Sequence, residues 1–278
     1  MRDFLSRMAA GSRARVVEAR GRLSESQLVR RASLRPLPPP LRLHPRFDVI
    51  AEIKPASPSA GPLAPVGPGG GDALIARARR YAGAGAAAIS VLTEPSAFGG
   101  SLLLLEGLAL ATTIPVIRKD FLVDPYQVAE ARDRGAAGVL LIVRLLPGGA
   151  LGEMLDAAWR FSLFALVEAF DETELERAVV AAEAAEAPAL VGINARDLET
   201  LEVDERRWER LAPRAASRAI VVAESGAGTP FDAARAAAAG CRAVLAGTAL
   251  MRDPDPGPRL AAMIDAGRET RLVREARG

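Results

Sequence analysis

The sequence predicts a (β/α)8 TIM barrel with an N-terminal helical extension. Two patterns lead to this fold class. From residue 48 onward, short apolar segments alternate eight times with segments rich in Ala, Arg and Glu, and polar residues follow the apolar segments. The chain length of 278 residues suits one barrel of this kind. We expect residues 1–47 to be a helical extension and Pro-rich linker packed on a catalytic barrel of residues 48–278.

The first 33 residues place apolar side chains among arginines, which is typical of one or two amphipathic helices. Four prolines between positions 36 and 40 then end the helix and stiffen a linker of about ten residues. Because so short a segment cannot bury a core of its own, we expect it to lie against the barrel.

The strands and helices of the barrel follow from the alternation. The expected strands are 49–53, 87–92, 115–118, 139–143, 164–167, 190–193, 220–223 and 243–246. The expected helices are 72–83, 101–111, 125–134, 150–160, 172–186, 205–211, 230–239 and 258–267. Asp124 before Pro125 is a helix start, and Gly135 stands where that helix ends. A doubly wound open sheet would normally carry a Gly-x-Gly-x-x-Gly turn after its first strand, and this chain has Lys-Pro-Ala-Ser-Pro-Ser there.

Composition excludes several functions. Cys241 and His44 are the only cysteine and the only histidine, so a disulfide within the chain, a His-ligated zinc site and a Ser-His-Asp triad are not expected. The net charge of +2 without blocks of like charge argues against nucleic acid as a partner. The absence of a long uncharged apolar run argues against a membrane, and the amino terminus lacks a signal-peptide pattern, so we expect a cytoplasmic protein.

Lysine is restricted to two positions, Lys54 and Lys119, among 36 Lys plus Arg residues. Lysine can give up a proton in a protein and arginine cannot, so these two positions are candidates for proton transfer. The alternative is that both are strand-end cations paired for structural reasons. In a barrel of this kind, active sites lie at the carboxyl ends of the strands. The polar residues at these ends are Glu52, Lys54, Thr93, Glu94, Arg118, Lys119, Asp120, Glu168, Asn194, Arg196, Glu224 and Ser225.

Other residues at these ends suggest what is bound there. Glycines after the last two strands, in 225–228 and 247–248, let backbone N–H groups approach a phosphate. Phe98 and Phe121 suit a flat aromatic substrate, or else close the barrel mouth as ordinary core. Asn194, the only asparagine, is a site residue or a turn residue. A metal site built from the glutamates is the less favoured alternative, because the lysines among them offset their charge.

These residues lie in segments that resemble the indole-3-glycerol phosphate synthase family. The matching segments are 52–59 (EIKPASPS), 90–95 (SVLTEP), 98–101 (FGGS), 115–124 (PVIRKDFLVD), 140–143 (LLIV), 166–168 (LVE), 192–200 (GINARDLET) and 223–226 (AESG). They extend in order along the barrel, each at an expected strand end. The amino-terminal segment resembles the extra helical segment of the family more weakly.

The resemblance implies a reaction and assigns roles. The substrate would be 1-(2-carboxyphenylamino)-1-deoxyribulose 5-phosphate, which closes its ring with loss of carbon dioxide and water, without a cofactor or metal. Lys119 would be the general acid and Glu168 the general base. Lys54 would hold an anionic group of the substrate and could share the acid role, while Glu52 and Asn194 would fix hydroxyls and lysines. The remaining implied contacts are Ser225, Gly226, Gly247 and Thr248 to the phosphate, Phe98, Phe121, Leu140 and Leu198 to the anthranilate ring, and Ser57, Arg196 and Glu224 in the pocket wall.

Some positions depart from the usual pattern of the family. Pro55 and Ala60 stand where basic residues are frequent in the family. The Gly- and Pro-rich stretch 61–71 is therefore less cationic than expected, and the sequence does not decide whether it acts as a lid. Phe170 replaces a frequent histidine, and the apolar stretch 102–105 replaces a more polar one. That stretch is either buried on the barrel or a contact surface.

Two other functions stay open at this point. A phosphoribosylanthranilate isomerase would resemble a pattern with a cysteine at the end of the first strand, where this chain has Glu52 and Lys54. A catalytically silent barrel that binds a phosphorylated metabolite is the second alternative. The expected partner is a small phosphorylated aromatic molecule, and the expected state is a monomer or weak homo-oligomer.

Overall fold

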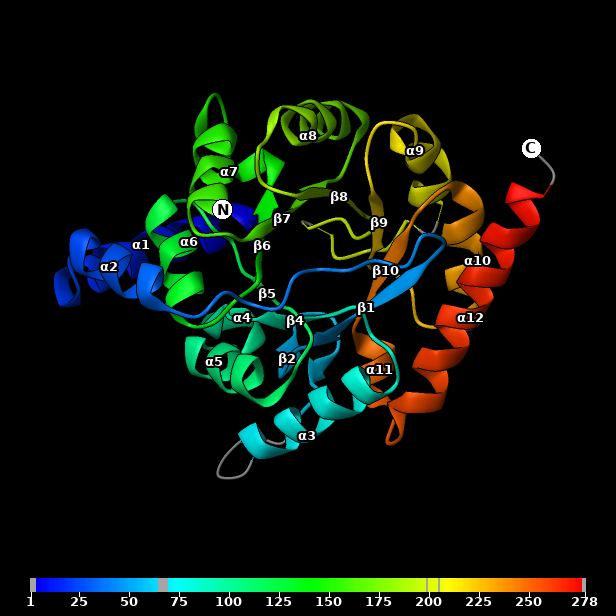
Figure 1. The fold of residues 1–278 in the computed structure, drawn as a ribbon, viewed down its shortest axis with the longest axis horizontal. Coiled ribbons are helices and arrows are strands. Elements are labelled where there is room, and N and C mark those ends of the chain that lie inside the picture. Colours follow the sequence, from blue (N-terminus) through cyan, green and yellow to red (C-terminus); the bar gives the residue numbers. More distant parts are fainter. Residues whose placement is uncertain (1–3, 65–69, 199, 205, 277–278) are drawn as a thin grey trace.

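The computed structural model describes residues 4–64, 70–198, 200–204 and 206–276. Within these residues, eight parallel strands close into one barrel surrounded by helices, so the predicted (β/α)8 fold is confirmed (Figure 1). The barrel closes where β1 pairs with β4 on one side and with β10 on the other. The strands are β1 (Asp48–Ile53), β4 (Ala88–Leu92), β5 (Val116–Lys119), β6 (Gly138–Ile142), β7 (Phe164–Ala169), β8 (Ala189–Asn194), β9 (Val221–Glu224) and β10 (Ala243–Ala246).

Helices occupy the segments between the strands, close to the positions that the sequence predicts. They are α3 (Gly70–Gly83), α4 (Pro95–Phe98), α5 (Leu102–Ala111), α6 (Pro125–Asp133), α7 (Ala150–Arg160), α8 (Glu172–Ala184), α9 (Arg207–Ala215), α10 (Pro230–Ala239), α11 (Thr248–Arg252) and α12 (Pro256–Glu275). A short hairpin of β2 (Ala56–Ser57) and β3 (Gly61–Pro62) follows β1, and the 3-10 turn η1 (Val143–Leu145) follows β6.

Two helix predictions need correction. The helix expected at 205–211 begins at Arg207 and continues to Ala215, and residue 205 lies outside the described residues. Its buried positions, Trp208, Leu211, Ala212 and Ala215, continue the helical spacing past the predicted end. The helix expected at 258–267 extends over Pro256–Glu275. Its prolines stand in the first turn, where proline is tolerated, and the helix continues past Gly267.

Side chains alternate between the inside of the barrel and the layer beneath the helices. In β1, Ile50 belongs to the apolar cluster inside the barrel, while Val49, Ala51 and Ile53 belong to the larger cluster between strands and helices. Since successive side chains of a strand point to opposite faces, Glu52 points inward like Ile50. The barrel interior is therefore apolar at its amino-terminal end and charged at its carboxyl end.

The amino-terminal extension consists of α1 (Phe4–Arg22) and α2 (Glu25–Leu34), which lie beside α6 (Figure 1). Polar contacts hold it there. Arg15 pairs with Asp120 at 2.7 Å, and Arg31 pairs with Asp133 at 2.7 Å. Gln127 donates a hydrogen bond to the hydroxyl of the buried Ser12 at 2.9 Å. The extension is thus bound to the segment that follows β5.

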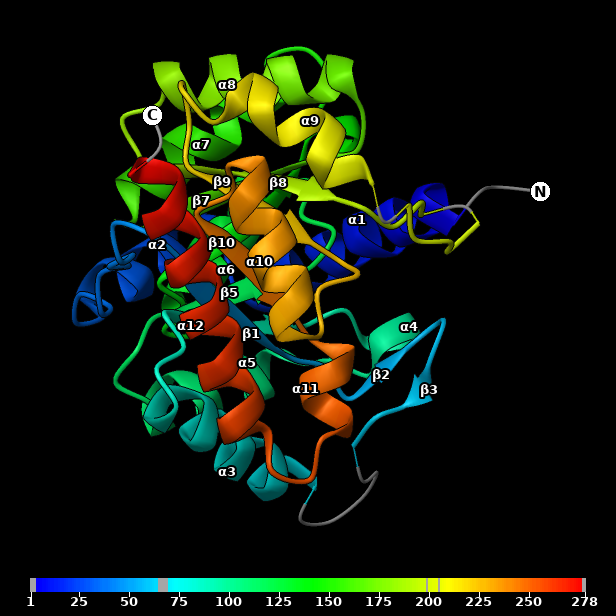
Figure 2. The same cartoon turned by 90° about the vertical axis from the view of Figure 1, so that its right-hand side faces the viewer.

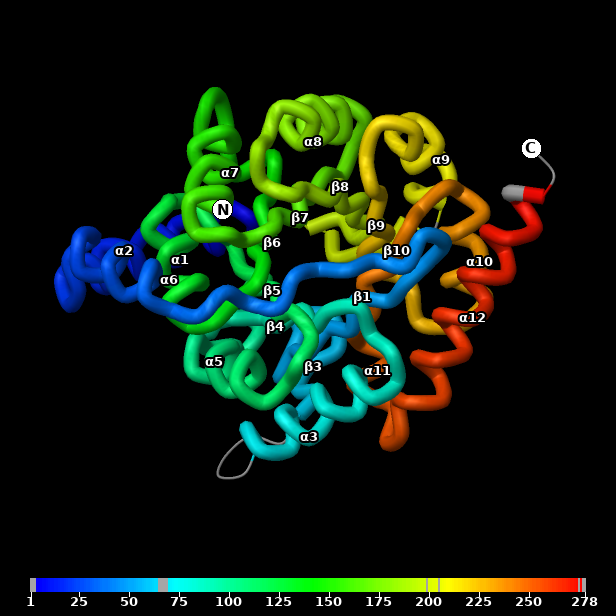
Figure 3. Tube along the Cα trace, in the orientation of Figure 1, coloured from blue at the N-terminus to red at the C-terminus, as the bar shows by residue number. Residues whose placement is uncertain are grey.

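The linker crosses the amino-terminal end of the barrel between α2 and β1, as Figure 3 shows. Leu41 and Leu43 pack against the apolar cluster inside the barrel, and Arg242 donates a hydrogen bond to the carbonyl of His44 at 3.2 Å. The linker therefore covers the amino-terminal end of the barrel, opposite the charged carboxyl end. Figure 2 shows α4 and the β2–β3 hairpin close together on another side of the barrel, where α4 contacts β2.

The contact between α12 and the linker yields a prediction on stability. A methyl group at Gly267 would lie 2.0 Å from the ring of Phe47, which is fully buried. Overpacking of this kind costs about 1–3 kcal/mol, which exceeds the gain of about 1 kcal/mol that alanine brings to a helix. We expect Gly267→Ala to lower the free energy of unfolding in urea. Gly257→Ala in the same helix, where the nearest atom is 3.8 Å away, is the control, and an equal loss in that variant would contradict the packing argument.

Candidate active site

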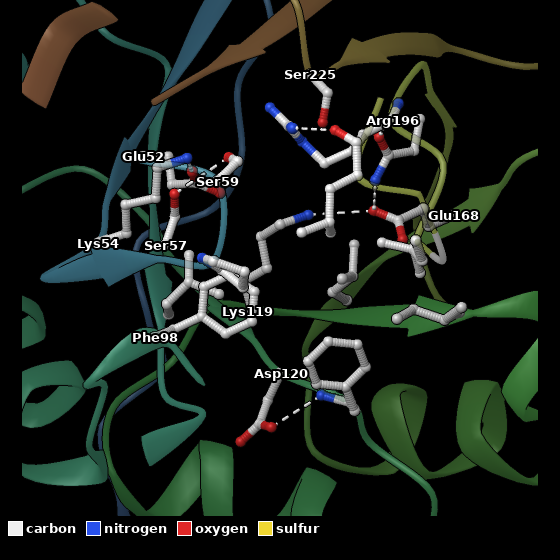
Figure 4. Close-up of a pocket in the computed structure, with 18 of the residues that line it drawn as sticks. Glu52, Lys54, Ser57, Ser59, Phe98, Lys119, Asp120, Glu168, Arg196 and Ser225 are labelled. Carbon is white, nitrogen blue, oxygen red and sulfur yellow. Dashed lines mark hydrogen bonds and ion pairs between the residues drawn. The ribbon is translucent and has the colours of Figure 1, made fainter. Parts of the chain in front are cut away.

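A hollow opens at the carboxyl end of the barrel strands. Its volume is about 710 Å³, a figure that includes space open to solvent, within the range of small-molecule sites. Charged side chains at the base of the hollow, here called the charged layer, face an apolar wall. The charged layer consists of Glu52, Lys54, Lys119, Glu168 and Glu224. Figure 4 shows Glu52, Lys54, Lys119 and Glu168 around the same space as Phe98 of the apolar wall. The predicted site residues that line the hollow are Glu52, Lys54, Ser57, Phe98, Lys119, Phe121, Leu140, Glu168, Asn194, Arg196, Leu198 and Ser225.

Lys119 lies at the centre of the charged layer. Its Nζ is 3.1 Å from Oε2 of Glu168 and 2.7 Å from Oε2 of Glu224, and Figure 4 shows Lys119 and Glu168 pointing toward each other. Burial alone would lower the pKa of Lys119, but the charges of Glu168, Glu224 and Glu52 outweigh burial and raise it well above its usual range. Lys119 is therefore an ammonium ion in the free protein.

Glu168 and Glu224 share this ammonium but differ in their other contacts. Oε2 of Glu168 also accepts a hydrogen bond from Nδ2 of Asn194 at 3.1 Å. Burial raises the pKa of Glu224 to about 8, opposed by the charge of Lys119 and reinforced by that of Glu168. Environments that differ in this way separate the acid and base roles of two carboxyl groups.

Lys54 and Glu52 form the second ion pair of the layer, with Nζ 2.7 Å from Oε1. Burial acts to raise the pKa of Glu52, but Lys54 and Lys119 together bring it below its usual range. Glu52 is therefore ionised, and it contributes a negative charge that both lysines experience.

A second cavity adjoins the hollow beside β9 and β10. Its lining includes Lys54, Lys119, Arg196 and Glu224, so the two spaces share the charged layer. Ser225 and Gly226 adopt the left-handed conformation, with φ of 61° and 80°. This turn and the start of α11 bring backbone groups to the cavity, an arrangement suited to a phosphate. The predicted phosphate residues that line it are Ser225, Gly226, Gly247 and Thr248.

The apolar wall contains an aromatic cluster. The ring centroids of Phe98 and Phe121 are 6.2 Å apart, and Phe4 of α1 contacts Phe121 edge-on at 6.0 Å. All three side chains line the hollow, together with Leu140 and Leu198. The wall is therefore able to hold a flat ring beside the charged layer.

Comparison with known proteins identifies the family. The family model for indole-3-glycerol phosphate synthase matches residues 5–263. The chain belongs to the indole-3-glycerol phosphate synthase family. The resemblance seen in the sequence is thereby confirmed.

Curated relatives carry the same family name over most of their length. The chain is 42% identical over 278 residues to indole-3-glycerol phosphate synthase of Mycobacterium avium (strain 104), which covers 98% of both chains. It is 46% identical over 259 residues to that of Nocardioides sp. (strain ATCC BAA-499 / JS614), which covers 91% of this chain and 95% of the relative. A solved thiamine phosphate pyrophosphorylase from Pyrococcus furiosus superposes with a TM-score of 0.57 at 15% identity, over 81% of this chain and 96% of that one, a likeness of fold alone.

Three polar residues at strand ends, Thr93, Glu94 and Arg118, line neither the hollow nor the second cavity of this synthase-family barrel, contrary to the sequence-based expectation. Arg118 donates to Thr93 and to the carbonyl of Gln127 beneath the helices. The carboxylate of Glu94 accepts hydrogen bonds from the first turn of α4. Because Lys119 points inward, its neighbour Arg118 must point outward. The alternation of side chains along the strand could have separated these residues.

Asp120 lines the hollow, but its carboxylate is engaged elsewhere. It accepts hydrogen bonds from Arg15 at 2.7 Å, from Thr93 at 2.7 Å and from the backbone N–H of Phe121 at 2.8 Å. Asp120 therefore connects the extension to β4 and to the aromatic wall, beside Lys119. No sequence signal reports this contact, because residues 15 and 120 are far apart along the chain.

Several lining residues were absent from the predicted set. Phe4 and Ser59 line the hollow, and Arg252 of α11 lines the second cavity. Ser59 ends the motif EIKPASPS and could have been included. Phe170, in contrast, lies beneath Arg144, with the guanidinium carbon 4.1 Å from the ring centroid. In the stretch 102–105, Leu105 is fully buried on the barrel and Leu103 is exposed, and residues 65–69 of the proposed lid stretch lie outside the described residues.

Two further findings concern the described residues as a group. In the ranges that the structure describes, no three His, Cys, Asp or Glu side chains gather as a metal ion would require. No helix in those ranges has the length and apolar character needed to span a membrane.

Gly247 provides a prediction on the second cavity. A methyl group there would lie 2.2 Å from Oε1 of Glu52 and 3.0 Å from Nζ of Lys54. We expect Gly247→Ala to displace this ion pair and to lower kcat/KM for indole formation by about 10²-fold, because ångström-scale misplacement has effects of that size. Gly149→Ala, at a position with no atom within 4 Å, is the matched control. Unchanged kinetics in a folded Gly247→Ala variant would contradict the spatial argument.

Proposed function

We propose that this barrel closes the ring of 1-(2-carboxyphenylamino)-1-deoxyribulose 5-phosphate to give indole-3-glycerol phosphate, with loss of carbon dioxide and water, as a carboxy-lyase of tryptophan biosynthesis. The observation that carries the proposal is the position of Lys119. Its ammonium lies between two carboxyl groups, with the aromatic wall on one side and a glycine-lined cavity on the other. Acid, base, ring site and phosphate site thus adjoin one another.

The first chemical step forms a carbon–carbon bond. The ring carbon that carries the carboxylate attacks the ketone carbon, and Lys119 donates a proton to the ketone oxygen. Carbon dioxide then leaves and the electrons of its bond restore the aromatic ring. Lys54 holds an anionic group of the substrate, and its contact with Glu52 at 2.7 Å keeps the ammonium in place.

The second step is dehydration. Glu168 removes a proton from the carbon next to nitrogen, and the hydroxyl leaves as water after it receives a proton. Asn194 donates a hydrogen bond to Glu168 and thereby orients the base.

The remaining roles follow the position of each residue. Phe98, Phe121, Leu140 and Leu198 enclose the anthranilate ring, and Ser57, Arg196 and Glu224 complete the pocket wall. Ser225, Gly226, Gly247 and Thr248 bind the phosphate. Residues 1–47 act as the extension and 48–278 as the catalytic barrel. We further propose a cytoplasmic monomer or weak homo-oligomer, supported by the sequence composition alone.

The isomerase alternative lacks its cysteine at the end of the first strand. Cys241 is fully buried and precedes β10, at the opposite end of the strand from the charged layer. Burial also raises the pKa of its thiol to about 12, so a thiolate is not available there. The catalytically silent barrel is the alternative that turnover decides.

Activity is tested with the purified protein and the carboxyphenylamino deoxyribulose phosphate, followed by indole fluorescence. We expect a rise in fluorescence that depends on protein concentration, together with indole-3-glycerol phosphate in the product mixture. A protein that binds the substrate by calorimetry without any rise in fluorescence would instead be the silent binder.

Lys119→Arg tests the general acid. We expect this variant to keep the positive charge and the folded circular dichroism but to lose about 10²- to 10⁴-fold in kcat, because guanidinium is a poor proton donor. The control is Arg160→Lys, the opposite exchange at an exposed residue in the last turn of α7. This variant should leave turnover unchanged. Near-normal turnover of Lys119→Arg would remove Lys119 from the acid role.

A further inference from the structure

Glu224 has one oxygen atom without a hydrogen-bond partner. Oε2 lies 2.7 Å from Nζ of Lys119, but Oε1 is buried and has no hydrogen-bond partner among the described residues. A bare carboxylate oxygen in this position would carry negative charge without a donor, which is costly. A proton on Glu224 lowers that cost, because a neutral carboxyl group is less costly to bury than a carboxylate.

The protein makes room for this oxygen. Gly192 lies on the adjacent strand β8, paired with Glu168 on one side and with Val222 on the other. A methyl group at Gly192 would lie 2.1 Å from Oε1 of Glu224. The missing side chain therefore leaves the space that the Glu224 carboxyl group occupies, on the strand between β7, which carries Glu168, and β9, which carries Glu224.

The charges around Glu224 also favour a proton. Lys119 of β5 contacts Glu224, and Glu168 of β7 binds the same ammonium. Glu52 of β1 and Lys54, directly after β1, line the same cavity. Three carboxyl groups thus face two ammonium groups. The half-buried Arg196 adds a third positive charge, which acts on Glu52. When like charges share one site, one of them keeps its proton. The pKa of about 8 for Glu224 agrees with this count.

The proposed reaction requires two proton donations to the same oxygen. The first converts the ketone oxygen to a hydroxyl, and the second lets that hydroxyl leave as water. One proton returns to the protein from the carbon next to nitrogen, so each turnover consumes one proton from solvent. Lys54 is paired with Glu52 and holds the substrate, so we assign both donations to Lys119. Lys119 can donate only one proton at a time and must then receive another before dehydration.

We propose that Glu224 supplies the second proton of the reaction by protonating Lys119 between ring closure and dehydration. The inference rests on the proposed function. After Lys119 has given its proton to the ketone oxygen, its neutral amine no longer donates to Oε2 of Glu224, 2.7 Å away. The carboxyl group then turns its protonated oxygen toward Nζ, transfers the proton to the amine and becomes a carboxylate. Lys119 then protonates the leaving hydroxyl, and Glu168 takes the proton from carbon. Glu168 returns that proton to Lys119 over 3.1 Å, and Glu224 regains one from solvent, so the protons balance.

Glu224→Gln separates the two stages, because the amide keeps a hydrogen-bonding group beside Lys119 but has no proton to transfer. In a single turnover with excess enzyme, carbon dioxide release reports ring closure and fluorescence reports the indole. We expect carbon dioxide release within about threefold of the unmodified protein and indole formation slower by about 10²-fold or more, the size of a proton-transfer contribution. The indoline intermediate that still carries the hydroxyl on the former ketone carbon should accumulate to about one equivalent.

Two outcomes would overturn the proposal. Equal slowing of both signals would mean that Glu224 only holds Lys119 in place, and no slowing would mean that it is not used. Glu153→Gln, a change at an exposed residue of α7, is the matched control. An unmodified protein that yields neither carbon dioxide nor indole would instead reject the proposed function, a result that is distinct from both.

The pH profile and a conservative variant add an independent measurement. A proton held with a pKa of about 8 is present below that pH and lost above it, so indole formation should decline as pH rises through about 8 while carbon dioxide release does not. Glu224→Gln should lack this decline, and Glu224→Asp, which keeps a proton on a shorter side chain, should retain it and recover part of the rate. An Asp variant as slow as the Gln variant would overturn the proposal, as would a Gln variant with the unmodified profile.

Discussion

The contact of one buried ammonium with two carboxyl groups is the constraint on which the site depends. Burial of an unpaired lysine charge would cost several kcal/mol, and Glu168 and Glu224 remove that cost at 3.1 and 2.7 Å from Nζ. The same contacts raise the pKa of Lys119 and make it a weak acid at rest. Such a lysine gives its proton to the substrate only where the developing negative charge on the substrate oxygen competes with these carboxyl groups, and it regains a proton readily afterwards.

The extension forms part of this arrangement. Asp120 directly follows the central lysine, and its carboxylate is bound by Arg15 of α1 and Thr93 at the end of β4. Phe4 of the same helix contacts Phe121 in the aromatic wall. The position of the backbone beside Lys119 therefore depends on α1 as well as on the barrel. The amino-terminal extension, which is too short to fold alone, thus helps to position Lys119.

The sequence was sufficient for the barrel, its eight strands and most of the charged layer, because alternation of segments and the position of polar residues at strand ends are local patterns. The sequence did not predict which side chains contact each other across the barrel, because those contacts depend on the register between strands. Neither the pairing of Glu224 with Lys119 nor the space above Gly192 can be read from spacing. Arg118 and Glu94 were misplaced because every polar residue at a strand end was treated alike, without regard to which face it occupies. Phe4 was missed since its contact joins residues 117 positions apart.

Gly192 and Gly247 leave the space in which the buried glutamates of the charged layer pack. Below this layer the interior is filled by residues such as Ile50, Ile117 and Leu166, which exclude water from beneath the carboxyl groups. Within it, Gly192 and Gly247 leave space where Glu224 and Glu52 lie. A side chain at either glycine would direct its neighbour toward solvent, where a glutamate has its ordinary pKa. The pKa values in the charged layer therefore depend on the missing side chains at Gly192 and Gly247 as well as on the charged residues.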